Sequence, residues 1–482
     1  MTRGRLLRKP LDTADKRTFR VRSAAALGPQ PSADLGPCGA FVELRRSPCS
    51  HGLLRNLPRV IFAALLALPL LASFAAAQSI SQKGFLELKG IGYPQTTTQD
   101  DTQAVGEALL RYEASAKPAT WLKLTGALNA RGDTHDQTTW DGVDWEDRGV
   151  TRPGLSVRRL SGLLSHGPVS LEVGKQFVRW GKTDILNPTD RFAPRDYLTV
   201  VDNDFLAVTG ARLTAGLQSN TLDLVWTRFT PSRTPLLDQR WSGLPEQLQA
   251  LPLVDAGAQF PTRSQAGARW SHVGSGFEFS LSGFSGNNNL PLIVTSVPTF
   301  PAGVVAAPLP VAMPPAIPAS VPIVRVYPQI WMAGGDAAVP LSFFTIKGEA
   351  AFFGTSDARA DQYWLYVIQV ERQSGEWFFV GGYSGEVVTL QRTQAQFAPD
   401  RGMTKAFLGR AGYTIDTNRS LAVEAAVRQN GDGSWMRFEY SQASGQHLRM
   451  TAQATWIRGE LTDFFGRYSR NSHATLTVRY SF

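Results

Sequence analysis

Charged side chains of both signs gather between Lys182 and Asn203. The residues in this stretch that could act on a solute are Lys182, Asp184, Asp190, Arg191, Arg195 and Asp196. If they face a water-filled passage, interleaved carboxylates and guanidinium groups create a transverse electric field that orients polar molecules. The alternative is a solvated loop, held by the turn at Asn187 and Pro188 and by a few local ion pairs. The sequence alone favours the solvated loop.

Other residues that could carry chemistry are dispersed along the chain. Five histidines follow residue 77, none of them in an H-E-x-x-H motif, and no G-x-S-x-G or P-loop spacing is present. The acidic stretch from Asp133 to Asp147 offers oxygen ligands for calcium, but it lacks the spaced D-x-D-x-D-G loop, which favours a solvated loop. We therefore expect no catalytic residue, no cofactor and no metal site. A hydrolase site assembled across several strands is the alternative.

The charge balance differs between two parts of the chain. The formal net charge is +9, but residues 1–77 hold 12 of the 49 basic and 4 of the 40 acidic residues. Residues 78–482 therefore carry 37 basic and 36 acidic side chains, and bulk charge does not predict nucleic acid as a partner. Both cysteines, Cys38 and Cys49, also lie in the first part. The second part consequently has no disulfide and no catalytic thiol.

One long apolar run, from Val60 to Phe74, is preceded by two arginines and followed by three alanines that end at Ala77. This is the pattern of a secretory signal peptide at about residues 53–77, with cleavage after Ala77. The run is shorter than the roughly 20 residues that a helix needs to cross a bilayer; a retained anchor is the alternative. Residues 1–50 do not resemble a signal peptide, and we expect that the start of translation has been assigned too early.

Residues 78–482 contain short runs in which apolar and polar residues alternate, the period of a strand with two different faces. In the last run, Leu476 and Val478 share one face, and Thr477 and Arg479 share the other. The alternation predicts eighteen strands, near residues 82–93, 105–116, 119–130, 155–164, 168–179, 203–215, 219–229, 264–273, 276–285, 326–340, 343–354, 361–373, 376–389, 403–415, 419–430, 434–443, 447–459 and 472–482.

Short and long connections alternate between these strands. Tight turns such as Ser374-Gly375 follow the even-numbered strands, and longer segments such as 180–202 follow most odd-numbered strands. This alternation is typical of a transmembrane β-barrel, whereas a propeller would repeat every four strands, and no such repeat is present. The predicted fold class is therefore all-β: a transmembrane, antiparallel, up-and-down barrel of about 18 strands, formed by residues 78–482.

The polar face of the strands carries many charges, and aromatic residues lie near strand ends. Both features favour a membrane barrel with a wet lumen over a soluble β-sandwich. The residues expected to face the lumen are Arg111, Glu113, Lys347, Glu349, Arg410, Glu424, Arg428, Arg437, Glu439, Arg449 and Arg479.

A signal peptide, a cysteine-free body and a final strand TLTVRYSF with a terminal aromatic residue together resemble Gram-negative outer-membrane porin-like barrels. In that class the last strand is read by the outer-membrane barrel assembly machinery. The resemblance implies an assembly signal at Leu476, Val478, Tyr480 and Phe482. The segment from Gly174 to Asp196, GKQFVRWGKTDILNPTDRFAPRD, is also similar to a strand-and-loop motif of large proteobacterial-type barrels and loosely to alginate-export-like porins.

The resemblance implies a place in the cell outer membrane, contact with its lipid, and passive diffusion of small-molecule solutes through the lumen. A barrel of sixteen to eighteen strands leaves an aqueous channel unless something plugs it. A plugged structural or export barrel that works with periplasmic partners is the alternative, and the sequence does not separate the two. Porins are often trimeric, which leaves a homo-oligomer open.

The connection from Asn287 to Pro328 contains ten prolines in 42 residues. Proline at this density opposes regular strand pairing and favours extended polyproline II structure. We interpret the connection as filler at a tolerant insertion point. A loop that lies in the barrel mouth or packs on a partner is the alternative.

Overall fold

The structure, a computed structural model, describes residues 80–235, 239–243, 253–295, 321–391 and 395–482. All of these belong to the second of two compact units, Ser50–Phe482. The expected signal peptide and the residues before it lie outside the described part of the chain. Among the described residues, no helix is long and apolar enough to cross a membrane.

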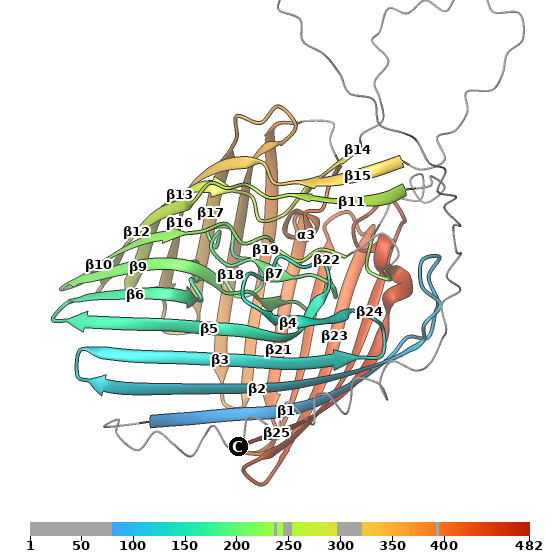
Figure 1. Ribbon diagram of the computed structural model, residues 1–482, viewed down its shortest axis with the longest axis horizontal. Coiled ribbons are helices and arrows are strands. Elements are labelled where there is room, and N and C mark those ends of the chain that lie inside the picture. Colours follow the sequence, from blue (N-terminus) through green and yellow to red (C-terminus); the bar gives the residue numbers. More distant parts are fainter. Residues whose placement is uncertain (1–79, 236–238, 244–252, 296–320, 392–394) are drawn as a thin grey trace, which may run out of the picture. The chain divides into compact units, whose positions relative to one another are not determined.

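Eighteen antiparallel strands of the described part form one closed sheet (Figure 1). In chain order they are β1 (Ile80–Gly92), β2 (Ala104–Ala119), β3 (Leu122–Asp133), β5 (Arg152–His166), β6 (Val169–Gln176), β9 (Val208–Leu217), β10 (Asn220–Thr227), β12 (Gln265–Gly274), β13 (Phe277–Asn287), β16 (Gln329–Pro340), β17 (Thr345–Gly354), β18 (Gln362–Ser374), β19 (Trp377–Leu390), β21 (Ala406–Thr414), β22 (Arg419–Arg428), β23 (Gly433–Ser444), β24 (Leu448–Gly459) and β25 (His473–Ser481). Each pairs with the next, and β25 pairs with β1, with Tyr480 opposite Leu86. The prediction of an 18-strand antiparallel barrel is confirmed.

Shorter elements occupy the connections between these strands. They are β4 (Thr138–Asp144), β7 (Arg195–Asp196), β8 (Asp204–Phe205), β11 (Leu253–Gln259), β14 (Leu292–Thr295), β15 (Val321–Val326), β20 (Ala395–Gln396), the helix α3 (Pro399–Gly402) and a 3-10 helix at Gly466–Asn471. β4 pairs in parallel with β5, and β7 pairs with β8. β11, β15, β14 and β20 form a separate four-stranded sheet.

Two strands of that small sheet come from the ends of the proline-rich connection, where we expected no regular pairing. The expectation is wrong for these ends: Ile293 of β14 lies opposite Arg325 of β15 in antiparallel register. The physical reason is local composition, because β14 reads LIVT and β15 reads VPIVRV, so β-branched residues outnumber proline there. Residues 296–320, which hold most of the prolines, lie outside the described residues.

Tight turns join the strands at one end of the barrel, as the alternation of connection lengths predicts. β2 ends at Ala119 and β3 begins at Leu122, and β18 ends at Ser374 and β19 begins at Trp377. Gly375 in the second turn has a φ of 57°, a left-handed conformation that glycine adopts without strain.

The outer face of the barrel is apolar and exposed. Leu88, Ile368 and Phe407 show 51%, 58% and 58% of their surface, which fits contact with lipid rather than with water. Aromatic residues gather near both ends of this face. Trp331 packs on Phe352 near the long connections, and other rings lie near the tight turns, as expected for interfacial girdles.

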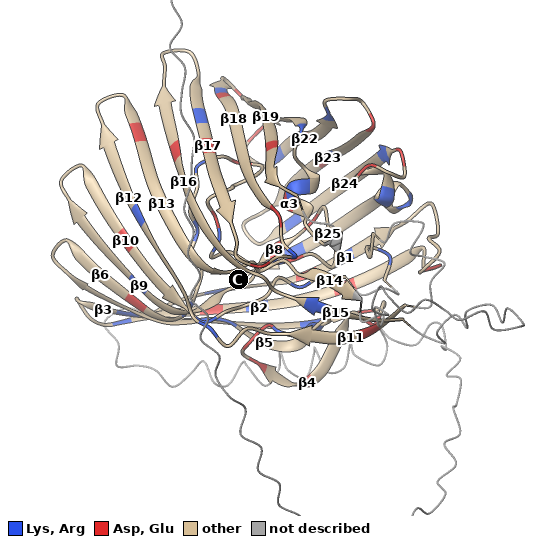
Figure 2. Cartoon of the chain, turned by 90° about the horizontal axis from the view of Figure 1, so that it is seen from above, with Lys and Arg blue, Asp and Glu red and all other residues tan. Residues whose placement is uncertain are grey.

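Charged residues point to the inside of the barrel. Because successive side chains of a strand alternate between faces, the neighbours of outward apolar residues face the lumen. Basic and acidic bands lie side by side on β9, β10, β12 and β16 (Figure 2). Arg212 pairs with Asp223 at 2.6 Å and Arg269 with Asp336 at 2.8 Å, so much of the wall charge is neutralised in place.

Candidate functional site

The connection between β6 and β9, residues 177–207, lies inside the barrel, and we call it the inner loop. Glu349 belongs to β17, which is distant from β6 and β9 in the order of the sheet. Its carboxylate accepts hydrogen bonds from the backbone N–H and the hydroxyl of Thr189, at 2.8 and 2.9 Å. Thr189 and Leu198 are completely buried. The connection is therefore not the solvated loop that the sequence favours, because it packs against the inner wall of the barrel.

Apolar packing explains why the inner loop lies inside. Phe192 packs edge to face against Trp180 and against Phe284 of β13, with ring centroids 5.1 and 5.0 Å apart. The buried cluster around these rings includes inward residues of five wall strands: Val225, Phe284, Met332, Ala351, Phe353 and Leu365. Each large apolar side chain removed from water contributes about 1.5–3 kcal/mol, so the inner loop is held by a hydrophobic core within the lumen.

Lys182 and Asp184, two of the six charges predicted for a constriction, form ion pairs with the barrel wall near the start of the inner loop. Lys182 Nζ lies 2.5 Å from the carboxylate of Glu278 on β13. Asp184 lies 3.4 Å from Nζ of Lys347 on β17, and its backbone N–H donates to the side chain of Gln369 on β18 at 3.0 Å. These contacts tether the start of the inner loop to three wall strands.

A third candidate, Asp190, is buried within the inner loop. It accepts hydrogen bonds from Nε of Arg179 at 2.9 Å and from the backbone N–H of Trp180 at 3.1 Å. Burial outweighs these contacts and raises the pKa of Asp190 to about 6. Asp190 therefore links Arg179 to the backbone of Trp180 within the inner loop and is shielded from solutes.

Arg191 and Arg195 are also engaged with protein groups. Arg191 lies 3.5 Å from Asp400 of α3. Arg195 donates a hydrogen bond to Asn203 at 2.8 Å, and its guanidinium carbon lies 4.2 Å from the centre of the Phe205 ring. Both side chains hold segments of the interior together.

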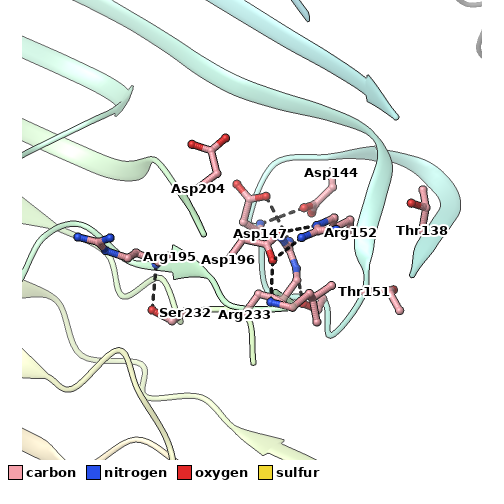
Figure 3. Close-up of polar contacts among 12 residues, drawn as sticks. Thr138, Asp144, Asp147, Thr151, Arg152, Arg195, Asp196, Asp204, Ser232 and Arg233 are labelled. Atoms are coloured by element: carbon pink, nitrogen blue, oxygen red, sulfur yellow. Dashed lines mark hydrogen bonds and ion pairs between the residues drawn. The ribbon is translucent and has the colours of Figure 1, made fainter. Parts of the chain in front are cut away.

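Asp196, the last of the six, is the centre of a buried network of ion pairs (Figure 3). Its carboxylate accepts hydrogen bonds from Nε of Arg152 at 2.9 Å and from Nη1 of Arg233 at 2.8 Å. Arg233 also lies 3.5 Å from Asp147, which pairs with the buried Lys175 at 2.6 Å. Burial alone would raise the pKa of Asp196, but the two guanidinium groups hold it well below its usual range. The network fixes the inner loop to β5 and β6.

A cavity of about 350 Å³ lies between the inner loop and the wall strands β1, β2, β3 and β25. Its charged lining residues are Glu87, Lys89, Glu107, Arg111, Arg131, Asp133, Arg152, Asp196, Asp202, Asp204 and Arg479. Of the six constriction candidates only Asp196 lines this cavity, and Arg111 and Arg479 are the lumen candidates that do. The volume lies in the range of pockets that hold small molecules.

Most cations of the cavity have a carboxylate partner, and Arg131 is the exception. Lys89 pairs with Asp202, and Arg152 pairs with Asp196. The guanidinium of Arg131 makes no hydrogen bond or ion pair with another residue of the described part, although it lines this cavity and a smaller one beside it. Arg131 is therefore the cation of the cavity that lacks a close carboxylate partner, although Glu107 and Asp196 attract it at longer range.

Sequence reasoning missed Arg131 because the third predicted strand ended at residue 130. β3 continues to Asp133. Extending the alternation by three residues would have placed Arg131 on the inward face together with Asn129 and Asp133, so the signal was present in the sequence.

The other lumen candidates occupy inward positions of the wall, away from the cavity. Glu424 of β22 lies opposite Arg437 of β23 in register, and the two form an ion pair at 2.7 Å. The candidates that line other parts of the wall are Glu113, Lys347, Glu349, Arg410, Glu424, Arg428, Arg437, Glu439 and Arg449.

The residues expected to form an assembly signal lie at the seam where β25 meets β1. Leu476 and Tyr480 are exposed on the outer face, and Val478 lies opposite Leu88 in register. Phe482 exchanges backbone hydrogen bonds of 2.9 and 3.0 Å with Gly84. The terminal residue therefore takes part in closing the barrel.

In the acidic stretch considered for calcium, two carboxylates accept hydrogen bonds from nearby backbone N–H groups. Asp133 accepts from the backbone N–H of His135 at 2.7 Å, and Asp144 accepts from that of Asp147 at 3.0 Å. Within the described ranges, no group of three or more His, Cys, Asp or Glu residues could hold a metal ion.

Comparisons with known proteins bear on the fold. No protein-family model and no curated protein matches the chain. The structure is similar to OccAB4 of Acinetobacter baumannii, with a TM-score of 0.50 and 8% identity over 84% of this chain and 98% of that chain. A BenF-like porin from Pseudomonas fluorescens Pf-5 has a TM-score of 0.49 and 10% identity over 85% of this chain and 99% of that chain. At these identities the likeness to OccAB4 is one of fold.

Proposed function

We propose that this chain is a channel of the outer membrane through which small solutes diffuse passively. The observation that carries the proposal is the charged cavity between the inner loop and β1, β2, β3 and β25, because it lies inside a barrel whose outer face is apolar. A closed sheet of eighteen strands is wide enough for an aqueous passage. An inward loop that reduces this passage admits small molecules and excludes larger ones.

The lining determines how strongly the cavity selects among charged solutes. Five basic and six acidic side chains line it, and paired charges largely cancel one another a few ångströms away. Arg131 makes no close ion pair, although Glu107 and Asp196 attract it at longer range. We infer that the ion selectivity of the cavity is weak and that Arg131 shifts it toward solutes with a negative group.

A second candidate function is supported by the apolar packing in the lumen. Besides the cluster around Phe192, a second buried cluster joins Val200 of the inner loop to Trp435 of β23 and Ile457 of β24. If these two clusters close the lumen together, the chain is a structural or export barrel that depends on periplasmic partners.

Conductance separates the two functions. The purified protein is inserted into a planar bilayer after its folding has been checked by the different migration of heated and unheated samples on a gel. Stable steps of nanosiemens scale support the channel. A barrel that inserts in the folded form and stays silent contradicts the channel and supports the plugged barrel.

We also propose how the chain reaches the outer membrane and to which barrels it is related. The leader of residues 1–77 would direct export, with a signal peptide at about residues 53–77, and the barrel assembly machinery would read the last strand. The motif from Gly174 to Asp196 favours a relationship to large porin-like barrels, loosely including the alginate-export-like ones. N-terminal sequencing of the mature protein tests the cleavage after Ala77, and cross-linking in membranes tests for a homo-oligomer.

A further inference from the structure

Asp202 of the inner loop reaches cations of the barrel wall. Its carboxylate lies 2.8 Å from Nζ of Lys89 on β1 and 3.9 Å from Nη1 of Arg437 on β23. Asp202 and Lys89 both line the cavity. One carboxylate therefore bridges the space between the inner loop and two wall strands at the edge of the proposed passage.

Asp204 makes a second bridge of the same kind. Its carboxylate lies 2.9 Å from Nη1 of Arg158 on β5 and 3.3 Å from Nη2 of Arg111 on β2. Arg158 offers both terminal nitrogens to the two oxygens of Asp204, at 2.9 and 3.3 Å. This two-point contact is the geometry in which a guanidinium binds any carboxylate.

Both bridges are accessible to water, unlike the ion pairs deeper in the interior. The side chains of Asp202 and Asp204 are 42% and 49% exposed, whereas that of Asp196 is 6% exposed. Exposed ion pairs are weak and exchange readily with dissolved ions. The bridges at Asp202 and Asp204 are therefore the contacts of the inner loop that a solute can replace.

At physiological pH these two bridges are not broken by protonation of the aspartates. Lys89 is the main cause that lowers the pKa of Asp202, to about 2. Burial would raise the pKa of Asp204, but Arg158 and Arg111 lower it below its usual value. Both carboxylates stay charged, so competition by another anion is the means of releasing the cations.

We propose that Asp202 and Asp204 are displaceable internal ligands, and that a solute with a carboxylate group enters the passage by replacing them on Lys89, Arg111 and Arg158. The inference rests on the proposed channel function and describes how that channel is regulated. In the absence of such a solute, the two aspartates narrow the cavity and neutralise its wall. In its presence, the cations bind the solute and the cavity widens.

Only the two side chains have to rotate, because the backbone on either side is fixed. Leu198 and Val200 are buried before Asp202. After Asp204, the Phe205 ring lies 3.6 Å from the guanidinium carbon of Arg179. A rotation of exposed side chains between fixed points needs no rearrangement of the inner loop.

The test compares the wild-type protein with the variant D202N/D204N in planar bilayers. The probe is potassium acetate, which replaces potassium chloride at constant ionic strength. Asparagine keeps the shape of the side chain and removes the charge that binds the wall. The control is D416N, because Asp416 is an exposed carboxylate that pairs with Arg419 in a turn of the barrel. Different migration of heated and unheated samples confirms that each variant is folded.

We expect the wild-type channel to have two conductance levels and acetate to raise the occupancy of the larger one. Two exposed ion pairs can shift such an equilibrium about 3- to 30-fold. The D202N/D204N channel should occupy the larger level in chloride already and respond little to acetate, and D416N should behave as the wild type does.

The outcomes separate this inference from the proposed function. A wild-type channel that conducts steadily, with the same levels and the same acetate response as D202N/D204N, overturns the displaceable aspartates and leaves the channel function standing. A wild type that is silent in chloride but conducts in acetate, beside a D202N/D204N variant that conducts in both salts, supports both the inference and the channel function. Silence of both inserted proteins in both salts overturns the inference and the channel function together.

Discussion

Thr183 and Thr189 share one hydrogen-bond acceptor, because the hydroxyl of each donates at 2.9 Å to the carboxylate of Glu349. The backbone N–H of Lys182 donates to the same carboxylate at 3.0 Å. Glu349 is itself 3% exposed. A single wall residue therefore holds both ends of a turn in the inner loop and sets how far this turn extends into the lumen.

The substitution E349Q should weaken that attachment. The amide keeps the size of the side chain, but its NH₂ group replaces one carboxylate oxygen and cannot accept a hydrogen bond. Some of the buried donors around residue 349 then lack an acceptor, which lowers the stability of the fold by about 1–3 kcal/mol. We expect the free energy of unfolding in urea to fall by about this amount and the channel current to become noisier. The control is E376Q, since Glu376 is exposed in a tight turn. Equal stability and equal noise in both variants would show that the inner loop is positioned by its apolar core alone.

Removal of the unpaired cation should change ion selectivity. In R131Q we expect the ratio of chloride to potassium permeability to fall about two- to fivefold, because one charge several ångströms from a passing ion contributes roughly 0.5–1 kcal/mol in a water-like medium. The reversal potential in a salt gradient measures this ratio. R410Q is the matched control, since Arg410 is exposed on the inward face of β21 and does not line the cavity. A shift of equal size in R410Q would mean that total lumen charge, and not the cavity, determines selectivity.

Asp190 should make stability depend on pH between about 4 and 6. Burial raises its pKa from 3.8 to about 6, so the folded chain holds a proton that the unfolded chain releases. The resulting stabilisation is present below pH 4 and is lost as the pH rises through 6, by at most about 3 kcal/mol. Because D190N has no proton to lose, the difference in unfolding free energy between wild type and D190N should change by this amount between pH 4 and pH 7. Parallel pH profiles of the two proteins would contradict the burial of this carboxylate.

The wall of the barrel was predictable from the sequence because its signal is local. The first strand was expected at residues 82–93 and is found at Ile80–Gly92, and the last was expected at 472–482 and is found at His473–Ser481. Alternation of apolar and polar residues depends only on the period of a strand. Tight turns at one end fix the register of each hairpin, so the order of strands follows from their order in the chain.

The interior was not predictable, because it depends on residues that are distant in the chain. Thr189 and its acceptor are separated by 160 positions, and no local pattern connects them. Inward positions were expected to be polar, but Met332 and Phe353 are apolar because the inner loop covers them. Charged residues such as Asp190 favoured a loop exposed to water. The sequence does not show the hydrogen-bond partners, here Arg179 and the backbone of Trp180, that accompany the burial of this carboxylate.

Arg240 offers a test of how the long connections are held together. Its guanidinium donates to the backbone carbonyls of Gln95 at 2.9 Å and Thr102 at 2.6 Å, and it lies 4.1 Å from the centre of the Tyr93 ring. These contacts join the connection after β10 to the connection between β1 and β2. Since the side chain of Arg240 is 1% exposed, its loss leaves several buried acceptors without a donor.

We expect R240A to destabilise these connections by on the order of 3 kcal/mol, with little change in the strands, whose hydrogen bonds are separate. Limited proteolysis of the folded protein should then cut within residues 93–103 much faster than in the wild type, while heated and unheated samples still migrate differently. R359Q is the control, because Arg359 is exposed and pairs with Asp357 beside it. If cleavage is equally slow in R240A and R359Q, the apolar contacts of Trp241 with Tyr468 suffice to hold the connections, and Arg240 adds only local order.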